Sequence, residues 1–289
     1  MAISRELREG TSGNHSGGDP HPLTGQRFAS PVPPGAGWPG DPADRHTPVA
    51  TNADDVATLA ESADTAADLD ARISVCRACE RLVTWREDVA RTGRRASFAD
   101  QPYWGRPGPG FGDDAPSVLV VGLAPAANGT NRTGRMFTGD RSGDWIYAAL
   151  HRGGYADLAT SEHAGDGQRL RGVRIVAAVR CAPPANKPTP SERSTCQHWL
   201  VKDLQLAQPT LRSILALGAI GWDAAVAGAR AAGWSVPRPK PKFGHGAEAV
   251  LTTTDGQQVT LFGSYHVSQQ NTFTGRLTEP MLDAVIARL

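Results

Sequence analysis

The sequence predicts an α/β fold in which helices cover both faces of a mostly parallel sheet. Apolar runs of strand length occupy residues 117–125, 174–184 and 213–218, and each run ends in Gly or Pro. Segments with helical spacing alternate with these runs. Unbroken apolar strands that alternate with helices are typical of a parallel sheet buried on both faces.

The remaining elements follow in chain order. Residues 54–91 have helical apolar spacing, with candidate core positions at Val56, Leu59, Leu69, Ile73, Leu82 and Val89. Residues 144–154 form a short helix that ends in Gly. Thr189, Pro190 and Glu192 fit a capping box with proline at the first helical position, which begins a helix to about Leu206. A helix over 219–233, a hairpin that turns at 255–256 and a helix over 278–289 complete the fold.

The N-terminal segment has a different composition. Residues 1–50 contain eight Gly and eight Pro, residue types that weaken helix and strand interiors. We therefore expect a disordered arm over 1–53, with Phe28 and Trp38 able to dock on the body, and a single domain over 54–289.

Charge is segregated along the chain. Residues 1–70 hold four Arg and eleven acidic residues, a balance of −7, whereas residues 71–289 hold 26 basic and 18 acidic residues, a balance of +8. Eight Arg but four acidic residues lie between Arg72 and Arg106. A solvated helix face would also show this pattern, but a basic body predicts a polyanionic partner such as nucleic acid.

The sequence predicts a cytoplasmic protein. No apolar run approaches the roughly 18 residues of a membrane span, and the first ten residues lack the apolar stretch of a secretory signal.

The four cysteines form a pattern typical of a metal site. Cys76 and Cys79 are three residues apart, Cys181 follows a predicted strand, and Cys196 lies one turn into the capped helix. Disulfides are not expected in a reducing cytoplasm. Four thiolates hold structural zinc or an iron–sulfur cluster, and the lack of a second C-x2-C pair favours the cluster. Buried thiols with no ligand are the alternative.

Two polar loops follow predicted strands and are candidates for the functional site. Residues 122–143 include five Gly, and residues 265–278 are mostly polar. Loops at the carboxyl ends of strands are where α/β sheets bind ligands. Neither a dinucleotide fingerprint nor a phosphate-binding P-loop is present.

The motifs in these loops resemble those of the family 5 (UDGb-type) uracil-DNA glycosylases. They are GLAPAANGTNRTGRMFTGD, CAPPANKPTP and HVSQQNTFTGR, together with C-x2-C, and the resemblance extends from Cys76 to the C-terminus. It implies a three-layer fold around a four-stranded, mostly parallel sheet. It also implies base excision repair of duplex DNA, with hydrolysis of the bond between uracil and its sugar. A broad substrate range that includes hypoxanthine is implied too, as is a [4Fe–4S] cluster on Cys76, Cys79, Cys181 and Cys196 near the DNA.

The resemblance also implies the roles of individual residues. A base glycosylase must stack the extruded base, bind its edge and stabilise the negative charge that develops on it. Phe137 is predicted to stack on the base, Asn186 to bind the pyrimidine edge, and His266 to lie beside the uracil O2. Gly122 and Ala124 are predicted to line the pocket. Packing under the loop for Phe137, turn capping for Asn186 and a structural role for His266 are the alternatives.

The residue that holds the attacking water is harder to assign. The GLAP segment offers Leu123 and Ala124, neither of which can polarise water, so Asp140 is the nearest candidate carboxylate. Asp140 as the cap of a helix that begins near Gly143 is the alternative. A weak base at this position would imply a larger pocket that accepts several different bases.

Several further polar residues of these loops are candidates for DNA contacts: Arg132, Arg135, Ser268, Gln269, Gln270, Asn271 and Arg276. A non-catalytic iron–sulfur protein that binds DNA is the alternative function. A nuclease would need a carboxylate cluster for metal, and the motif loops hold few acidic residues. We expect a monomer that works on the DNA of the nucleoid.

Overall fold

The computed structural model describes residues 17–289. Its α-helices are α1 (Ala53–Glu61), α2 (Ala66–Val75), α3 (Glu80–Arg91), α4 (Thr130–Thr133), α5 (Arg141–Arg152), α6 (Pro190–Ala207), α7 (Gly218–Ala231), α8 (Gln269–Thr272) and α9 (Glu279–Ile286). Its strands are β1 (Asp19–Pro20), β2 (Arg27–Phe28), β3 (Phe111–Gly112), β4 (Val118–Gly122), β5 (Val173–Ala177), β6 (Ser213–Leu217), β7 (Glu248–Thr252) and β8 (Gln258–Ser264). No helix among these residues is long and apolar enough to cross a membrane.

The main sheet has the strand order β3-β5-β4-β6-β8-β7. The four central strands are parallel, as predicted, and Val120 of β4 pairs with Ile175 of β5 and Leu215 of β6. The short strand β3 and the hairpin strand β7 add antiparallel edges that extend the predicted four strands to six. The hairpin turns at 255–256, as predicted, because Thr252 pairs with Gln258.

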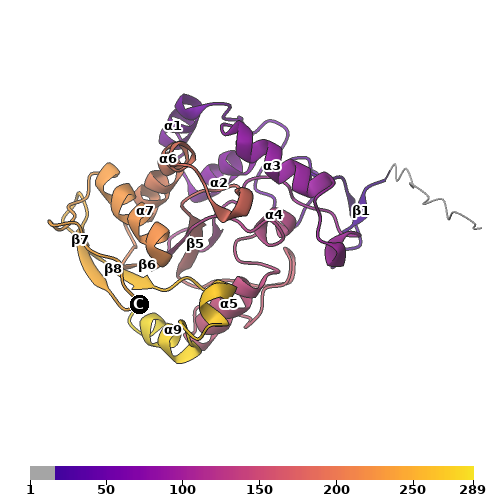
Figure 1. Cartoon of the computed structure of the whole chain (residues 1–289). Helices are drawn as coiled ribbons and strands as arrows, with labels where there is room; N and C mark the ends of the chain where they lie inside the picture. Colours follow the sequence, from indigo (N-terminus) through magenta and orange to yellow (C-terminus); the bar gives the residue numbers. More distant parts are fainter. Residues whose placement is uncertain (1–16) are drawn as a thin grey trace, which may run out of the picture.

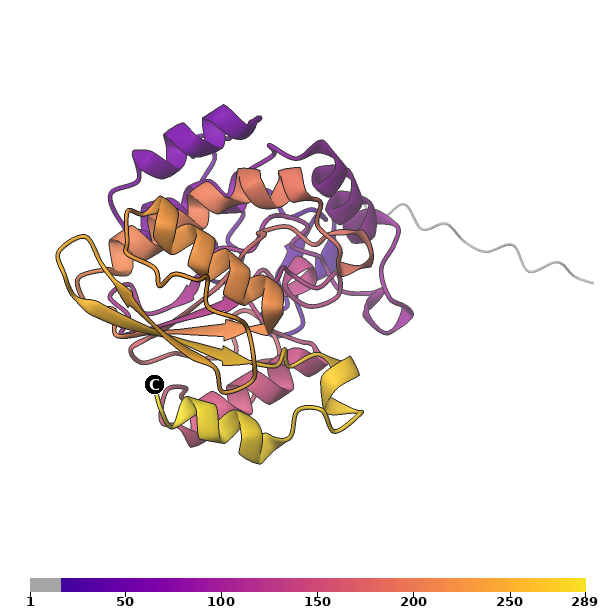
Figure 2. The same cartoon turned by 60° about the vertical axis from the view of Figure 1, so that its left-hand side comes forward.

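Helices cover both faces of the sheet (Figures 1 and 2). Along β4, Val118 and Val120 pack toward Ile146 of α5 and Leu282 of α9. The alternate residues of β4, Leu119 and Val121, join the cluster under α6 and α7. Because successive strand residues point to opposite faces, one apolar run supplies both cores. The two clusters confirm the predicted three-layer α/β fold.

Local sequence signals also determine where helices begin. In α6, the Thr189 side chain accepts from the Glu192 N–H, and the Glu192 side chain accepts from the Thr189 N–H, which is the predicted capping box.

Of the six core positions predicted over 54–91, Leu59 is partly buried and the other five are buried.

Residues 17–53 differ from the arm expected over 1–53. The side chains of Phe28, Val32 and Trp38 are at most 3% exposed, and the Trp38 indole donates to the Thr133 carbonyl at 3.2 Å. This strap (residues 17–53) therefore packs on the body, with the docking predicted for Phe28 and Trp38. Burial of its few large apolar side chains orders this segment in spite of its high Gly and Pro content. Residues 1–16 of the predicted arm lie outside the described part of the chain.

Candidate active site

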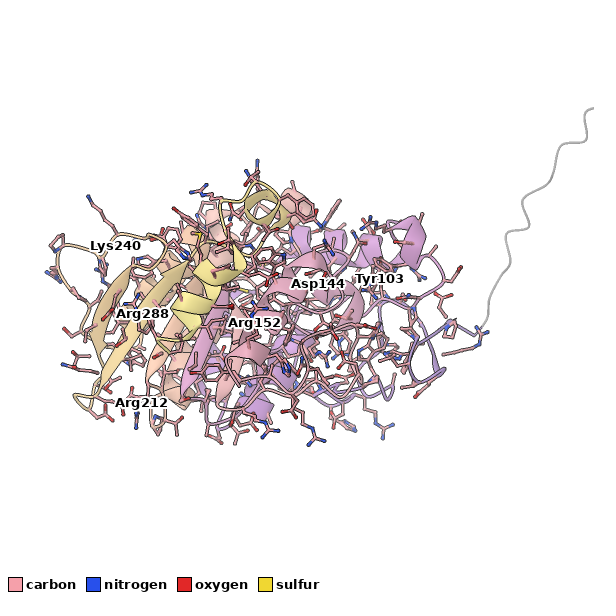
Figure 3. The ribbon with its side chains drawn as sticks, turned by 90° about the horizontal axis from the view of Figure 1, so that it is seen from below. Tyr103, Asp144, Arg152, Arg212, Lys240 and Arg288 are labelled. Carbon is pink, nitrogen blue, oxygen red and sulfur yellow. The ribbon has the colours of Figure 1, made fainter. Side chains whose placement is uncertain are left out.

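A cavity of about 580 Å³ opens at the carboxyl ends of the parallel strands. Its walls include Gly122, Ala177 and Leu217, which end β4, β5 and β6, and Tyr265, which follows β8. Figure 3 shows the two edges of the sheet: Arg212 immediately precedes β6 at the amino edge, and Lys240 lies at the opposite edge. The volume falls within the roughly 300–1,000 Å³ of small-molecule sites.

The residues predicted for catalysis come together in this cavity. Phe137, Asp140, Asn186 and His266 all contribute to its walls from three separate loops. The predicted lining residues Gly122 and Ala124 do so as well.

Backbone strain is also concentrated here. Phe137, Ala185 and Asn186 have φ angles of 51°, 51° and 55°, and they are the non-glycine residues with positive φ in the described chain. All three line the cavity. Such conformations cost about 1–3 kcal/mol each and tend to cluster at functional sites.

Phe137 forms one wall of the cavity. Its ring lies over Gly122, where an added Cβ would approach the Phe137 ring to 3.0 Å. The ring is half-buried, and its centroid is 6.2 Å from that of His266. The aromatic face is therefore positioned to stack on a planar ligand, although part of the ring also packs against the core.

His266 faces the cavity from the end of β8. Burial lowers the pKa of its imidazole to about 4, because the charged form loses solvation. The ring is therefore neutral near pH 7 and can donate one N–H. Asn271 fixes the loop by donating from Nδ2 to the His266 carbonyl at 2.8 Å. Gly218, at φ 84°, lets the chain pass close, since a Cβ there would lie 3.2 Å from the His266 Cβ.

Asp140 is both a helix cap and a cavity residue. Its Oδ1 accepts from the Gly143 N–H at 2.9 Å, so the alternative reading as the cap of α5 is confirmed. Its Oδ2 lies against Gly129, where an added Cβ would be only 2.0 Å away. Burial raises the pKa of the carboxyl, while the N–H groups at the start of α5 oppose that rise. The same carboxylate also contributes to the cavity wall.

Asn186 lies in the short helix η2 (Pro184–Asn186) at the mouth of the cavity. Its side chain is exposed and makes no hydrogen bond to any residue from 17 to 289. The capping role considered as an alternative is therefore not observed. Both amide atoms are available to a ligand.

The residues predicted to contact DNA fall into two groups. Ser268, Gln270, Asn271 and Arg276 line the mouth of the cavity around α8, whereas Gln269 is exposed on α8 outside the lining. The side chain of Asn271 holds the His266 carbonyl.

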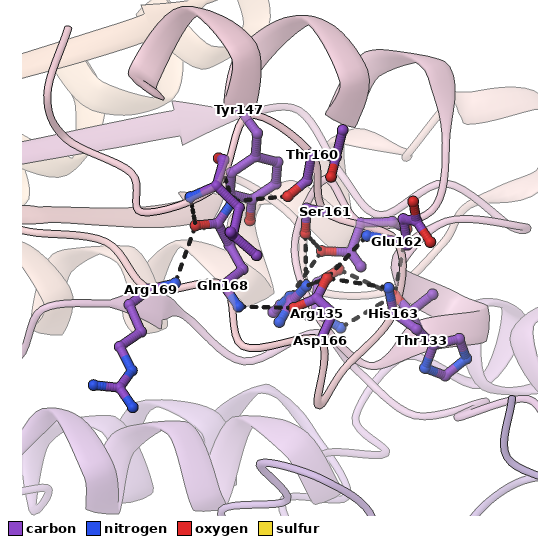
Figure 4. Close-up of polar contacts among 12 residues, drawn as sticks. Thr133, Arg135, Tyr147, Thr160, Ser161, Glu162, His163, Asp166, Gln168 and Arg169 are labelled. Atoms are coloured by element: carbon purple, nitrogen blue, oxygen red, sulfur yellow. Dashed lines mark hydrogen bonds and ion pairs between the residues drawn. The ribbon is translucent and has the colours of Figure 1, made fainter. Parts of the chain in front are cut away.

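Arg132 and Arg135 do not fit the predicted DNA contacts. Arg132 is 3% exposed, donates to the carbonyls of Asn128 and Gly139, and stacks on Phe98 at 3.9 Å. Arg135 is 7% exposed and paired with Asp166 at 2.5 Å (Figure 4). These guanidiniums hold the loop from inside and cannot reach a phosphate.

The Arg-rich segment from Arg72 to Arg106 is also used internally. Arg81 pairs with Glu192 at 2.7 Å, and Arg106 pairs with Asp41 at 2.8 Å. Internal partners are also found for Arg72, Arg77, Arg86, Arg91 and Arg94. Most arginines of this run are therefore paired with carboxylates of the protein itself.

The four cysteines gather around a second, small cavity. Cys76 directly follows α2 and Cys79 directly precedes α3, so both lie on the turn between these helices. Cys181 and Cys196 complete the lining, and the Arg86 guanidinium donates to the Cys181 Sγ at 2.8 Å. None of the four forms a disulfide. Burial, followed by repulsion from Cys181, raises the pKa of Cys76 to about 11 and that of Cys79 to about 12.

Across residues 17–289, no group of three or more His, Cys, Asp or Glu side chains is placed to hold one metal ion.

Sequence reasoning missed part of the cavity wall. Gly218, Phe243 and Tyr265 line it, and Phe243 comes from the long loop between α7 and β7. Gly218 could have been predicted to line the cavity, because it ends the third apolar run of the sequence. Nothing local in the sequence places Phe243 beside the end of β8.

The fold and cavity define a class of three-layer α/β proteins with a ligand site at the strand ends. The sequence model of the Uracil DNA glycosylase superfamily matches residues 109–289. A type-5 uracil-DNA glycosylase of Mycobacterium bovis is 57% identical over 265 residues, 92% of this chain and 96% of the relative. Type-5 enzymes of Mycobacterium leprae (56%, covering 75% and 91%) and Thermus thermophilus (47%, covering 74% and 92%) are also similar.

The chain therefore belongs to the uracil DNA glycosylase superfamily, and these three relatives are named type-5 uracil-DNA glycosylases.

Proposed function

We propose that this protein is a monofunctional uracil-DNA glycosylase of base excision repair. The observation that carries the proposal is the convergence of Phe137, Asp140, Asn186 and His266 on one cavity with strained walls. The relatives named type-5 uracil-DNA glycosylase, one of which matches 92% of the chain, support the same activity.

We propose a step in base release for each of these residues. The extruded uracil stacks on Phe137, and the Asn186 amide offers a donor and an acceptor to its edge. As the bond from C1′ to the base nitrogen breaks, its electron pair leaves with the base. The neutral His266 donates a hydrogen bond to the carbonyl oxygen that gains this charge. Water then adds to C1′ and loses its proton, and we propose the Asp140 Oδ2 as the acceptor of that proton.

Uracil need not be the only substrate. The cavity of about 580 Å³ leaves room for a larger base. We propose that hypoxanthine and other deaminated bases are also excised.

We propose that Cys76, Cys79, Cys181 and Cys196 hold a [4Fe–4S] cluster, because all four line one small cavity. Four cysteine thiolates are the usual ligand set of such a cluster. When bound, it would supply a rigid cross-link rather than chemistry at the base. Cys76 and Cys79 would tie the turn between α2 and α3 to Cys181 after β5 and Cys196 in α6.

We also propose that the protein works as a monomer on nucleoid DNA, since its substrate is the chromosome.

One gel experiment distinguishes the candidate functions. The full chain is incubated with a uracil-containing duplex, and the products are separated with and without alkali treatment. Strand breaks that require alkali indicate a monofunctional glycosylase. Direct breaks would indicate a nuclease, and a bound but intact duplex would indicate the non-catalytic iron–sulfur DNA-binding protein.

A further inference from the structure

The loop between α7 and β7 carries an unusual row of cations. Residues 237–243 read Pro-Arg-Pro-Lys-Pro-Lys-Phe, so that prolines alternate with Arg238, Lys240 and Lys242. Two of the four lysines of the chain lie here, and residues 232–247 include no acidic residue. All three cationic side chains are exposed. We call residues 237–243 the basic loop.

The basic loop is held firmly against the body. The buried Trp222 donates from Nε1 to the Pro241 carbonyl at 3.0 Å, which pins the middle of the loop. The centroid of the Phe243 ring lies 6.1 Å from that of Trp222 and 6.4 Å from that of Tyr265. Prolines further restrict the backbone, because each fixes its own φ and limits the residue before it. The loop therefore presents its cations with little ordering cost on binding.

This position is beside the cavity that receives the base. Phe243 and Tyr265 line that cavity, and Lys240 lies at the same edge of the molecule (Figure 3). Arg276 lies on Tyr265, with its guanidinium 4.6 Å from the ring centre. Cations thus flank the cavity on two sides.

The cations of the basic loop are largely free to bind an external anion. Lys240 is paired with Asp223 at 2.7 Å, but both side chains are about half exposed. Arg238 and Lys242 make no ion pair with any residue from 17 to 289. By contrast, most of the arginines between Arg72 and Arg106 already have internal carboxylates. Cations without an internal carboxylate are available to neutralise DNA phosphates, which releases the counterions condensed on the DNA.

We propose that the basic loop is a phosphate clamp that binds the DNA backbone beside the extruded base. The proposal rests on the proposed function, because it takes DNA as the partner. Arg238 and Lys242 bind phosphates directly, whereas Trp222 and Phe243 fix the loop to the cavity wall. The contacts are to the backbone, so they set affinity and position without reading the base.

The test is binding of the full chain to an undamaged fluorescent duplex over a series of salt concentrations. The double variant Arg238→Ala/Lys242→Ala should bind roughly tenfold or more weakly at moderate salt. Its slope of log K against log salt should fall by about 1.8, or 0.9 for each lost phosphate contact. The conservative variant Arg238→Lys/Lys242→Arg should retain both quantities.

The matched control is Arg212→Ala/Arg230→Ala, which removes two exposed cations. Arg212 lies at the amino edge of the sheet (Figure 3), and Arg230 lies in the last turn of α7. An unchanged slope in the test variant, or an equal change in this control, would overturn the proposal. Single-turnover excision at saturating protein should stay within about twofold of the wild type, because the clamp does not touch the base. Binding to undamaged DNA involves no chemistry, so failure of the clamp and failure of the glycosylase assignment are separately visible.

Discussion

Asp140 combines a structural and a chemical task in one carboxylate. Oδ1 caps α5, and Oδ2 remains beside Gly129 at the cavity. Asp140→Asn keeps a good helix cap but removes the proton acceptor. We expect an unchanged melting temperature and normal binding of uracil-containing duplex. Single-turnover excision should slow by about 10²–10⁴-fold, the usual contribution of a general base.

The control for this prediction is Asp144→Asn, which changes an exposed carboxylate in the first turn of the same helix. A near-wild-type excision rate for Asp140→Asn would remove Asp140 from the catalytic residues. Water positioning would then fall to backbone groups of the loop.

His266 gives a second prediction at the scale of one residue. Its pKa is lowered to about 4, so the imidazole remains the same neutral donor from pH 8 down to about pH 5. The single-turnover rate should therefore show no inflection near pH 6.5 and should fall only as the pH approaches 4. His266→Ala should lower the rate by about 10²–10³-fold, with little effect on DNA binding. An inflection near 6.5 that disappears in this variant would mean that the charged form acts.

At the scale of elements, the proposed cluster joins α2, α3, α6 and the end of β5. Purified protein should be brown, with iron in clear excess over zinc. Cys196→Ala should lose iron and lower the melting temperature, because the cross-link between these elements is lost. The control Ala78→Ser changes a residue between Cys76 and Cys79 that is not a proposed ligand, so this variant should keep its iron. Stoichiometric zinc without iron would contradict the cluster.

The sequence predicted elements well where the signal is local. The capping box at Thr189 and Glu192 and the turn at 255–256 depend on neighbouring residues, and both were found. Exposure depends on the whole fold, so the burial of Arg132 and Arg135 could not be predicted from their loop. The same limit explains Phe243, which reaches the cavity only because its loop returns to the end of β8.

At the scale of the whole molecule, the strap extends the core of the domain. Trp38→Ala should cost about 3–5 kcal/mol of unfolding free energy, since a buried aromatic leaves a cavity. Trp85→Ala, at a site 37% exposed, should cost much less. Urea denaturation measures both. Removal of residues 1–50 should destabilise the protein for the same reason. An unchanged stability in Trp38→Ala would mean that the strap does not add to the core in solution.

The strap also makes stability depend on pH. His21 of the strap and His163 of the body are 1% and 2% exposed, and their ring centres are 4.2 Å apart. The Nδ1 of His21 accepts from the N–H groups of Leu23 and Thr24. The Nε2 of His21 and both ring nitrogens of His163 have no partner among residues 17–289. Neither ring can therefore be protonated without a buried, unpaired charge.

Protonation of these rings should accordingly unfold the protein in acid. Burial lowers the pKa of His163 to about 3, and electrostatic repulsion by His21, Arg132 and Arg135 acts in the same direction. Burial also lowers the pKa of His21. The unfolded chain takes up these protons below about pH 6.5, whereas folded His163 does so only near pH 3. Stability is therefore complete above pH 6.5 and declines between 6.5 and 3, by about 1.4 kcal/mol per pH unit for His163, and the lowered pKa of His21 adds to the decline below pH 6.5. His163→Phe should flatten this decline in urea titrations at pH 7, 6 and 5, whereas His46→Gln, at an exposed site, should leave it unchanged. An equally steep decline in His163→Phe would assign the acid sensitivity to other groups.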